Sequence, residues 1–319
     1  KSLGSAFKML SPEGTRWHHF RWVAYAGNYL LMMFYTMVAG WMLNYIVYSL
    51  TGQLSGKNVE QIGGEFNNML STPSVMIFWT LVVVVISILV CSLGLQKGVE
   101  KISKVMMILL FALMIIMAVN SLLLDGSSEG LKFYLVPDFS KMKEQGIGNV
   151  VFAAMSHAFF TLGLGIGSME IFGSYLSRDC KLTGESINVV ILDTVVALTA
   201  GIIIIPACFA YGINPGAGPS LLFITLPNVF NQMPGGVIWE VLFFIFMAFA
   251  ALSTVIAVYE NIIAMTMDLF NCSRKRASLV NLFIIAVLSM PAVLGYNVLS
   301  GLQPLGAGTT IMDLEDFIV

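Results

Sequence analysis

The residues of this sequence that are best placed for chemistry are oxygen donors inside long apolar stretches. Ser253 and Thr254 are adjacent, and the carbonyl of Ala250 lies one helical turn before them, so three oxygens fall within one turn. Neutral, hard oxygens of this kind suit a cation such as Na⁺. The alternative is structural, because Ser and Thr hydroxyls in membrane helices often bond back to the carbonyl of residue i−4.

A glycine repeat marks a second candidate site. Thr161 precedes Gly163, Gly165 and Gly167 near the middle of an apolar run over residues 150–176. Each glycine lowers helix propensity by ~1 kcal/mol relative to alanine, so the helix is weakest there. Because hydrocarbon offers no water to unpaired backbone groups, an unwound segment at that depth must line a cavity or bind a guest. In the alternative, the helix is continuous and the glycines only let a neighbouring helix approach closely.

Four other polar side chains lie inside apolar runs. Asp193 needs a cation or a hydrogen-bond donor, because an ionisable group at that depth is costly; Na⁺ or a structural hydrogen bond would satisfy it. No Lys or Arg lies at the depth of Glu170 or Glu260, so we expect both to be neutral, water-exposed or hydrogen-bonded. Tyr35 brings a phenol donor to the middle of the first run, although a packing role is the alternative.

The composition identifies the class of protein. Of 319 residues, 57% are hydrophobic and only 11% are charged, whereas soluble domains carry roughly 25% charged residues. The mean hydropathy is +0.86. The chain is therefore an integral membrane protein with the lipid bilayer as a partner. Its net charge of −2 gives no broad basic surface, which excludes a nucleic-acid partner on electrostatic grounds.

The apolar runs predict an all-α membrane domain over residues 1–319. A span needs about 20 apolar residues, and seven runs meet that length: 22–50, 75–96, 102–124, 150–176 (interrupted near 163–167), 188–212, 237–270 and 277–299. An eighth run begins near residue 316 and is not completed. The chain also lacks a starting Met, so we expect a fragment of a longer polypeptide.

The distribution of Lys and Arg predicts the orientation. One alternate set of connections carries twelve of these residues and the other carries four. By the positive-inside rule the richer set is cytoplasmic, which puts the residues before 22 in the cytoplasm. The outer connection over 213–236 is uncharged and apolar, so we expect a lid packed into a vestibule, with an interfacial helix as the alternative.

Four sequence segments together resemble one family. They are residues 159–167 (Phe-Phe-Thr-Leu-Gly-Leu-Gly-Ile-Gly), 218–227 (Gly-Pro-Ser-Leu-Leu-Phe-Ile-Thr-Leu-Pro), 273–276 (Ser-Arg-Lys-Arg) and 137–139 (Pro-Asp-Phe). The sequence resembles the neurotransmitter:sodium symporter family, in its bacterial amino-acid-transporter branch. The resemblance covers essentially the whole chain and implies a leucine-transporter-like helical bundle. The seven runs would be the family's third to ninth spans, and residue 316 would open the tenth.

The resemblance also implies roles for individual residues. Tyr35 would hydrogen-bond the substrate carboxylate and Phe160 would cover the substrate. Thr161 and Asp193 would bind the first sodium ion, and Ala250, Ser253 and Thr254 the second. The remaining substrate contacts implied by the resemblance are Leu31, Val38, Gly163, Ile166, Thr254 and Val258. No charge occurs in this last set, so the pocket should suit a neutral, apolar amino acid.

For the complete protein, the resemblance implies sodium-coupled symport of a neutral amino acid across the cytoplasmic membrane of a bacterium. Asp193 would supply the negative charge that chloride supplies in animal relatives, so we expect Na⁺ to be required and chloride not. A homodimer is an open option. The family's first two spans, which complete both sodium sites, and the last spans have no counterpart here, so the fragment alone should not transport.

Two other functions are alternatives. A non-transporting remnant, or an amino-acid sensor on a transporter scaffold, would keep the same helices without moving substrate. An intramembrane enzyme has no support, because the sequence contains no paired aspartates, no HExxH motif and no Ser/His pair at a plausible depth. We therefore expect the protein not to be an enzyme.

Overall fold

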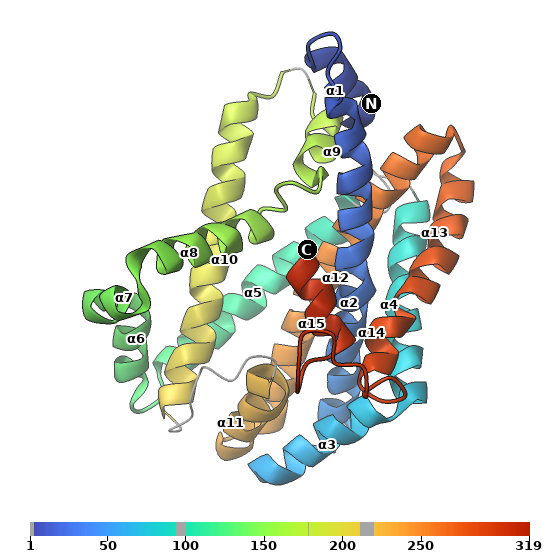
Figure 1. The fold of residues 1–319 in the computed structure, drawn as a ribbon. Coiled ribbons are helices and arrows are strands. Elements are labelled where there is room, and N and C mark those ends of the chain that lie inside the picture. Colours follow the sequence, from blue (N-terminus) through green and yellow to red (C-terminus); the bar gives the residue numbers. More distant parts are fainter. Residues whose placement is uncertain (1–2, 94–99, 178, 211–219) are drawn as a thin grey trace.

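A computed structural model describes residues 3–93, 100–177, 179–210 and 220–319, and this part of the chain is helical without strands (Figure 1). The all-α prediction is confirmed. The predicted span ends at 94–96 and 211–212, the start of the predicted lid at 213–219, and Gly218 and Pro219 of the family motif lie outside the described residues.

The helical elements follow one another along the chain, and the connection between α14 and α15 is the longest within a described range. They are α1 (Leu3–Leu10), η1 (Trp17–His19), α2 (Phe20–Leu50), α3 (Val59–Ser71), α4 (Pro73–Ser92), α5 (Lys101–Leu122), α6 (Ser127–Leu135), α7 (Phe139–Gln145), α8 (Ile147–Thr161), α9 (Ser168–Tyr175), α10 (Leu182–Ala210), η3 (Leu221–Thr225), α11 (Leu226–Gln232), α12 (Gly236–Phe270), α13 (Arg274–Leu288), α14 (Met290–Gly295) and α15 (Ile311–Ile318).

Six helical segments of the described chain are long and apolar enough to cross a bilayer. They contain α2, α4, α5, α10, α12 and the α13–α14 pair. The predicted span over 150–176 is divided between α8 and α9, neither of which has that length. The eighth run begins earlier than predicted, because Thr310 and Asp313 form a capping box that starts α15 at Ile311.

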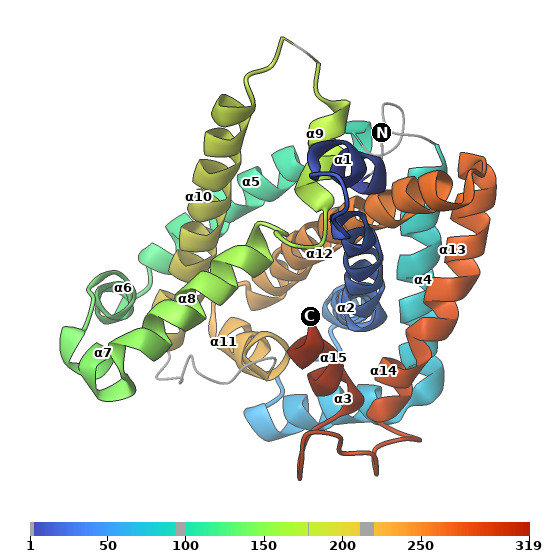
Figure 2. The ribbon, with the colours of Figure 1, turned by 45° about the horizontal axis from the view of Figure 1, so that its top comes forward.

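The pair α2 and α12 forms the centre of the fold, with the most extensive contacts between helices of the described chain. α4 packs against α2, and α13 packs against α4. On the opposite side of the pair lie α8, α9 and α10, where α10 contacts α5 and α6 (Figure 2). The pair therefore supplies a fixed wall, and the interrupted helix faces it.

The connections rich in Lys and Arg gather at one end of the molecule. α2, α10 and α13 all begin at this end, and α3 and α11 lie at the other (Figure 1). The alternation of basic and non-basic connections thus coincides with the two ends of the bundle. This arrangement fits a multi-pass membrane protein.

Two segments at the far end are helical: α3, between α2 and α4, and η3, which with α11 forms the described part of the predicted lid. The connection over 51–74 contains α3, which begins with a capping box between Asn58 and Gln61 and buries Ile62, Phe66 and Met69. α3 was not among the predicted helices, because Gly63 and Gly64 obscure this apolar stripe in the sequence. The second segment is η3, where Phe223 stacks on Phe66 at 5.2 Å between ring centroids.

The described part of the predicted lid packs into the protein. Phe223 is buried between Tyr45 and Phe244 as well as Phe66. The amide of Asn231 in α11 donates to the carbonyls of Leu54 at 2.7 Å and Lys57 at 3.1 Å. η3 and α11 are therefore fixed to α3 and to the turn that follows α2.

Candidate functional site

The helix breaks at the glycine repeat. α8 ends at Thr161, α9 begins at Ser168, and Gly163, Gly165 and Gly167 adopt φ values of +61°, +90° and +81° between them. Only glycine enters this region of φ without strain, which explains why the repeat interrupts the helix. The unbroken-helix alternative is wrong.

One backbone carbonyl in the break finds a partner on α2, and a side chain at the start of α9 finds one on α12. The Asn28 amide donates to the carbonyl of Ile166 at 2.7 Å. The Asn261 amide donates to the Ser168 hydroxyl at 2.7 Å and to the Asn28 side-chain oxygen at 3.1 Å. Both asparagines are fully buried. A chain of amides thus fixes the start of α9 and the carbonyl of Ile166 to the central helix pair.

The two residues predicted for the first sodium site lie together. The Thr161 hydroxyl, at the end of α8, donates to a carboxylate oxygen of Asp193 on α10 at 3.2 Å. The same hydroxyl lies 3.3 Å from the carbonyl of Ala158. One carboxylate, one hydroxyl and one carbonyl therefore lie beside the break, and hard cations prefer such oxygen ligands.

The three oxygens predicted for the second sodium site also lie close together. The Ser253 hydroxyl donates to the carbonyl of Ala250 at 2.8 Å, and the Thr254 hydroxyl does so at 3.2 Å. This pattern is also the back-bonding that Ser and Thr adopt in membrane helices. A Na⁺ site and helical back-bonding therefore both account for the positions of these three oxygens.

A cavity of about 630 Å³ opens beside the break. Four of the predicted substrate contacts line it: Leu31, Phe160, Gly163 and Ile166. Further wall comes from α8 and from Asp316 and Phe317 of α15. Phe160 is 49% exposed and lies at the edge of α8 beside this cavity.

The other predicted substrate contacts are not part of this cavity's described lining. Val258 is buried in α12, and Tyr35 and Val38 pack partly buried against the hydrophobic core. The structure thus divides the predicted set into a group around the break and a group on the facing sides of α2 and α12.

Glu260 is hydrogen-bonded, which was one of the expected outcomes, but the expectation that no Lys or Arg reaches its depth is wrong. Glu260 is fully buried and ion-paired with Arg274, whose guanidinium donates to both carboxylate oxygens at 2.7 and 2.8 Å. Tyr175 of α9 donates to the same carboxylate at 3.1 Å. Hydropathy assigns Arg274 to a connection, but its long side chain extends from the start of α13 back into the bundle.

Sequence reasoning missed the two asparagines that position the break. Asn28 and Asn261 are the available signal, because each is an amide inside an apolar run. A buried amide must find hydrogen-bond partners, and an unwound segment supplies them. The pairing is a tertiary contact that local sequence does not reveal, because 138 residues separate Asn28 from Ile166.

Comparisons with known proteins decide the family. The Sodium:neurotransmitter symporter family pattern matches residues 65–312. The chain belongs to the sodium:neurotransmitter symporter family. It is 36% identical to an uncharacterized sodium-dependent transporter of Bacillus subtilis, YhdH, over 98% of this chain and 68% of the relative. A similar relative from Haemophilus influenzae is 32% identical over 94% of this chain and 66% of the relative.

A solved structure in this family agrees with the fold. The crystal structure of MhsT in complex with L-phenylalanine superposes with a TM-score of 0.88 at 38% identity, covering 99% of this chain and 70% of that one. The predicted leucine-transporter-like bundle is therefore confirmed, and the family consists of transporters rather than enzymes. The chain spans about two thirds of the length of these bacterial relatives.

Proposed function

We propose that the complete protein is a sodium-coupled symporter of neutral amino acids. The observation that carries this proposal is the oxygen cluster of Thr161 and Asp193 beside the unwound segment, next to a cavity of about 630 Å³. Interrupted membrane helices at which ions and substrates bind are how secondary transporters build their sites. Family membership supports the same mechanism.

The proposed substrate is a neutral amino acid with an apolar side chain. Leu31, Gly163 and Ile166 give the cavity an apolar wall beside the break, and the carboxylate of its described lining, Asp316, belongs to α15. The substrate carboxylate would lie near the first sodium ion, within reach of the Tyr35 phenol. MhsT is described with L-phenylalanine and a more distant rat relative is a taurine transporter, so relatives accept different amino compounds.

Sodium and substrate are proposed to bind cooperatively. A cation held by Thr161 and Asp193 lowers the electrostatic cost of placing the substrate carboxylate nearby. Bound substrate then raises the affinity for the cation by the same factor. Ala250, Ser253 and Thr254 would hold a second Na⁺. Because Asp193 already supplies a negative charge, chloride is not needed.

The proposed movement is a rocking of α8, α9 and α10 against the α2–α12 pair. α8 has no buried residue, whereas α2 and α12 bury a large part of their length. The glycines between α8 and α9 supply the hinge. We propose that the protein lies in the cytoplasmic membrane of a bacterium with the basic connections inside.

Uptake into proteoliposomes tests this function. The full-length protein is reconstituted, an inward Na⁺ gradient is imposed, and accumulation of radiolabelled L-phenylalanine, L-leucine and L-alanine is followed. We expect accumulation with Na⁺ and none when choline replaces it, with no change when gluconate replaces chloride. Equal accumulation in choline would overturn the proposal. Sodium-dependent binding without accumulation would favour a sensor.

A further inference from the structure

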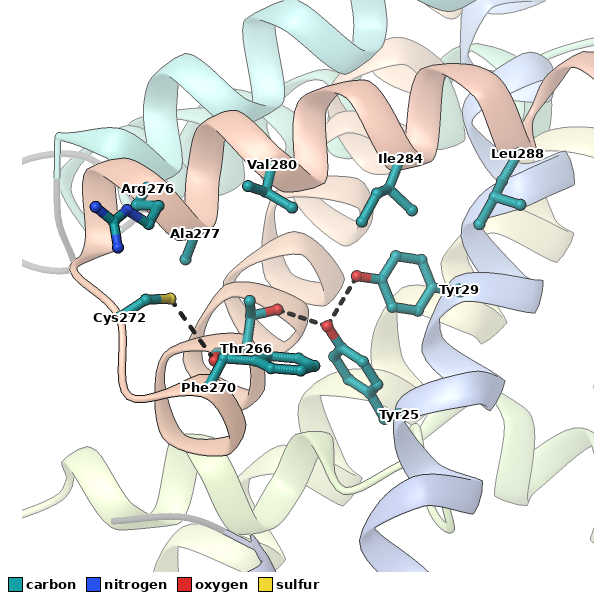
Figure 3. Close-up of a pocket in the computed structure, with 10 residues that line it drawn as sticks. All are labelled: Tyr25, Tyr29, Thr266, Phe270, Cys272, Arg276, Ala277, Val280, Ile284 and Leu288. Atoms are coloured by element: carbon teal, nitrogen blue, oxygen red, sulfur yellow. Dashed lines mark hydrogen bonds between the residues drawn. The ribbon is translucent and has the colours of Figure 1, made fainter.

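A second cavity lies away from the break, between α2, α12 and α13. Its volume is about 500 Å³ (Figure 3). Its Arg276 end lies at the start of α13, which is at the end of the molecule where α2 and α10 also begin (Figure 1). Figure 3 shows Arg276 at one end of this groove and Leu288 at the other. The groove is separate from the candidate ion and substrate residues, none of which lines it.

One wall of the groove is an apolar stripe along α13. Ala277, Val280, Ile284 and Leu288 follow one another at intervals of three or four residues, which places them on one face of the helix. Val280 and Ile284 remain 45% and 38% exposed. From Arg276 to Leu288 the stripe is about 18 Å long at the rise of an α-helix, close to the thickness of one hydrocarbon leaflet, about 15 Å.

The polar groups on the floor of the groove satisfy one another. The Tyr25 hydroxyl is 2.9 Å from that of Tyr29 and 2.7 Å from that of Thr266. Asn281 donates to Thr266 at 3.0 Å and accepts a hydrogen bond from Tyr29. This closed set joins α2, α12 and α13, so the groove is preformed and its floor needs no polar ligand.

The charge at the mouth of the groove is positive. Arg274 is committed to Glu260, but Arg276 lines the groove and is exposed, whereas the neighbouring Lys275 is not part of the described lining. No Asp or Glu belongs to the described lining. A ligand that matches this groove has an anionic head at Arg276 and a single apolar chain along α13.

We propose that this groove binds an anionic phospholipid, with its phosphate at Arg276 and one acyl chain against Val280, Ile284 and Leu288. The bilayer surrounding the protein supplies such a ligand, and basic pockets between membrane helices on the cytoplasmic side are known to take anionic head groups. The proposal requires a membrane protein but does not depend on the symport proposal.

Native mass spectrometry of the full-length protein in detergent tests the site. Phosphatidylglycerol and phosphatidylcholine with identical acyl chains are added, and the retained lipid is measured. Val280→Trp fills the groove, and Leu279→Trp is its control, because Leu279 is 59% exposed and does not line the cavity. Arg276→Gln removes the charge at the mouth, and Lys275→Gln is its control.

We expect the wild-type protein to retain phosphatidylglycerol about fivefold better than phosphatidylcholine, the preference that one Arg near an anionic head group provides. Val280→Trp should abolish retention of both lipids, Arg276→Gln should abolish only the preference, and both controls should behave as wild type. Wild-type retention in Val280→Trp, or an unchanged preference in Arg276→Gln, would overturn the proposal. Arg276→Gln remains decisive if Val280→Trp does not fold. A polypeptide segment occupying the groove in the full-length protein would also overturn it.

Discussion

At the scale of single residues, the candidate site depends on a few oxygens whose chemistry is visible in the sequence. Thr161 and Asp193 could be singled out because each places a polar group in an apolar run. The Thr161 hydroxyl lies 3.2 Å from a carboxylate oxygen of Asp193. The ion pair between Glu260 and Arg274 could not be predicted in the same way, since it depends on how α13 returns to α12.

Asp193 tests the proposed ion site directly. Asp193→Asn removes a negative charge next to the cation, and such a charge contributes more than about 1.4 kcal/mol even near a protein surface. We expect the Na⁺ concentration for half-maximal uptake to rise at least about tenfold. Glu185→Gln, in the first turn of the same helix, is the control and should leave it unchanged. An unaltered Na⁺ dependence in Asp193→Asn would remove this residue from the site.

Tyr35 tests the proposed substrate contact. Tyr35→Phe removes the phenol hydroxyl while keeping the ring, and a hydrogen bond to a charged group contributes about 1.5–3 kcal/mol. Substrate affinity, measured by competition with a radiolabelled amino acid, should fall by about tenfold or more. Tyr48→Phe, near the C-terminal end of α2, should have no effect. Equal affinities for the two variants would show that the phenol does not bind substrate.

At the scale of elements, the position of the break could be predicted from the local sequence. The hydrogen bonds that hold the break in place could not. The three glycines weaken the helix wherever they occur, so the interruption between α8 and α9 could be predicted from sequence. The Asn28 and Asn261 amides, which donate hydrogen bonds to the interrupted segment and to the start of α9, lie on other helices. α3 was missed for a different reason, because two glycines obscured its apolar face.

Gly165 tests whether the break itself is needed. Gly165→Ala places a side chain at a φ of +90°, which costs roughly 1–2 kcal/mol or forces the segment to change. The added methyl has open space around it, so strain rather than a clash is responsible. We expect a lower unfolding temperature and a loss of uptake.

Gly173→Ala is the matched control for this prediction. Gly173 lies in α9 and its added methyl also meets open space, but its φ is ordinary. Alanine there should leave uptake intact and raise the unfolding temperature slightly, because it improves helix propensity. Uptake by Gly165→Ala at the wild-type rate would show that the break is dispensable.

At the scale of the whole molecule, the segregation of basic connections at one end of the bundle predicts its orientation. Cys180 is exposed in a basic connection, so a membrane-impermeant maleimide should not label it in right-side-out vesicles. Ser300→Cys, at the opposite end, should be labelled in a variant with Cys180 replaced by serine. Labelling of Cys180 from outside would mean that the orientation is reversed.

The central claim is that Na⁺ and substrate meet at the break over residues 162–167. A density map of the full-length protein in saturating Na⁺ and L-phenylalanine tests it most directly. We predict an interrupted helix, an ion between the Thr161 hydroxyl and the Asp193 carboxylate, and ligand density against Ile166. A continuous ladder of helical hydrogen bonds through the glycines, or ligand density elsewhere, would contradict the claim.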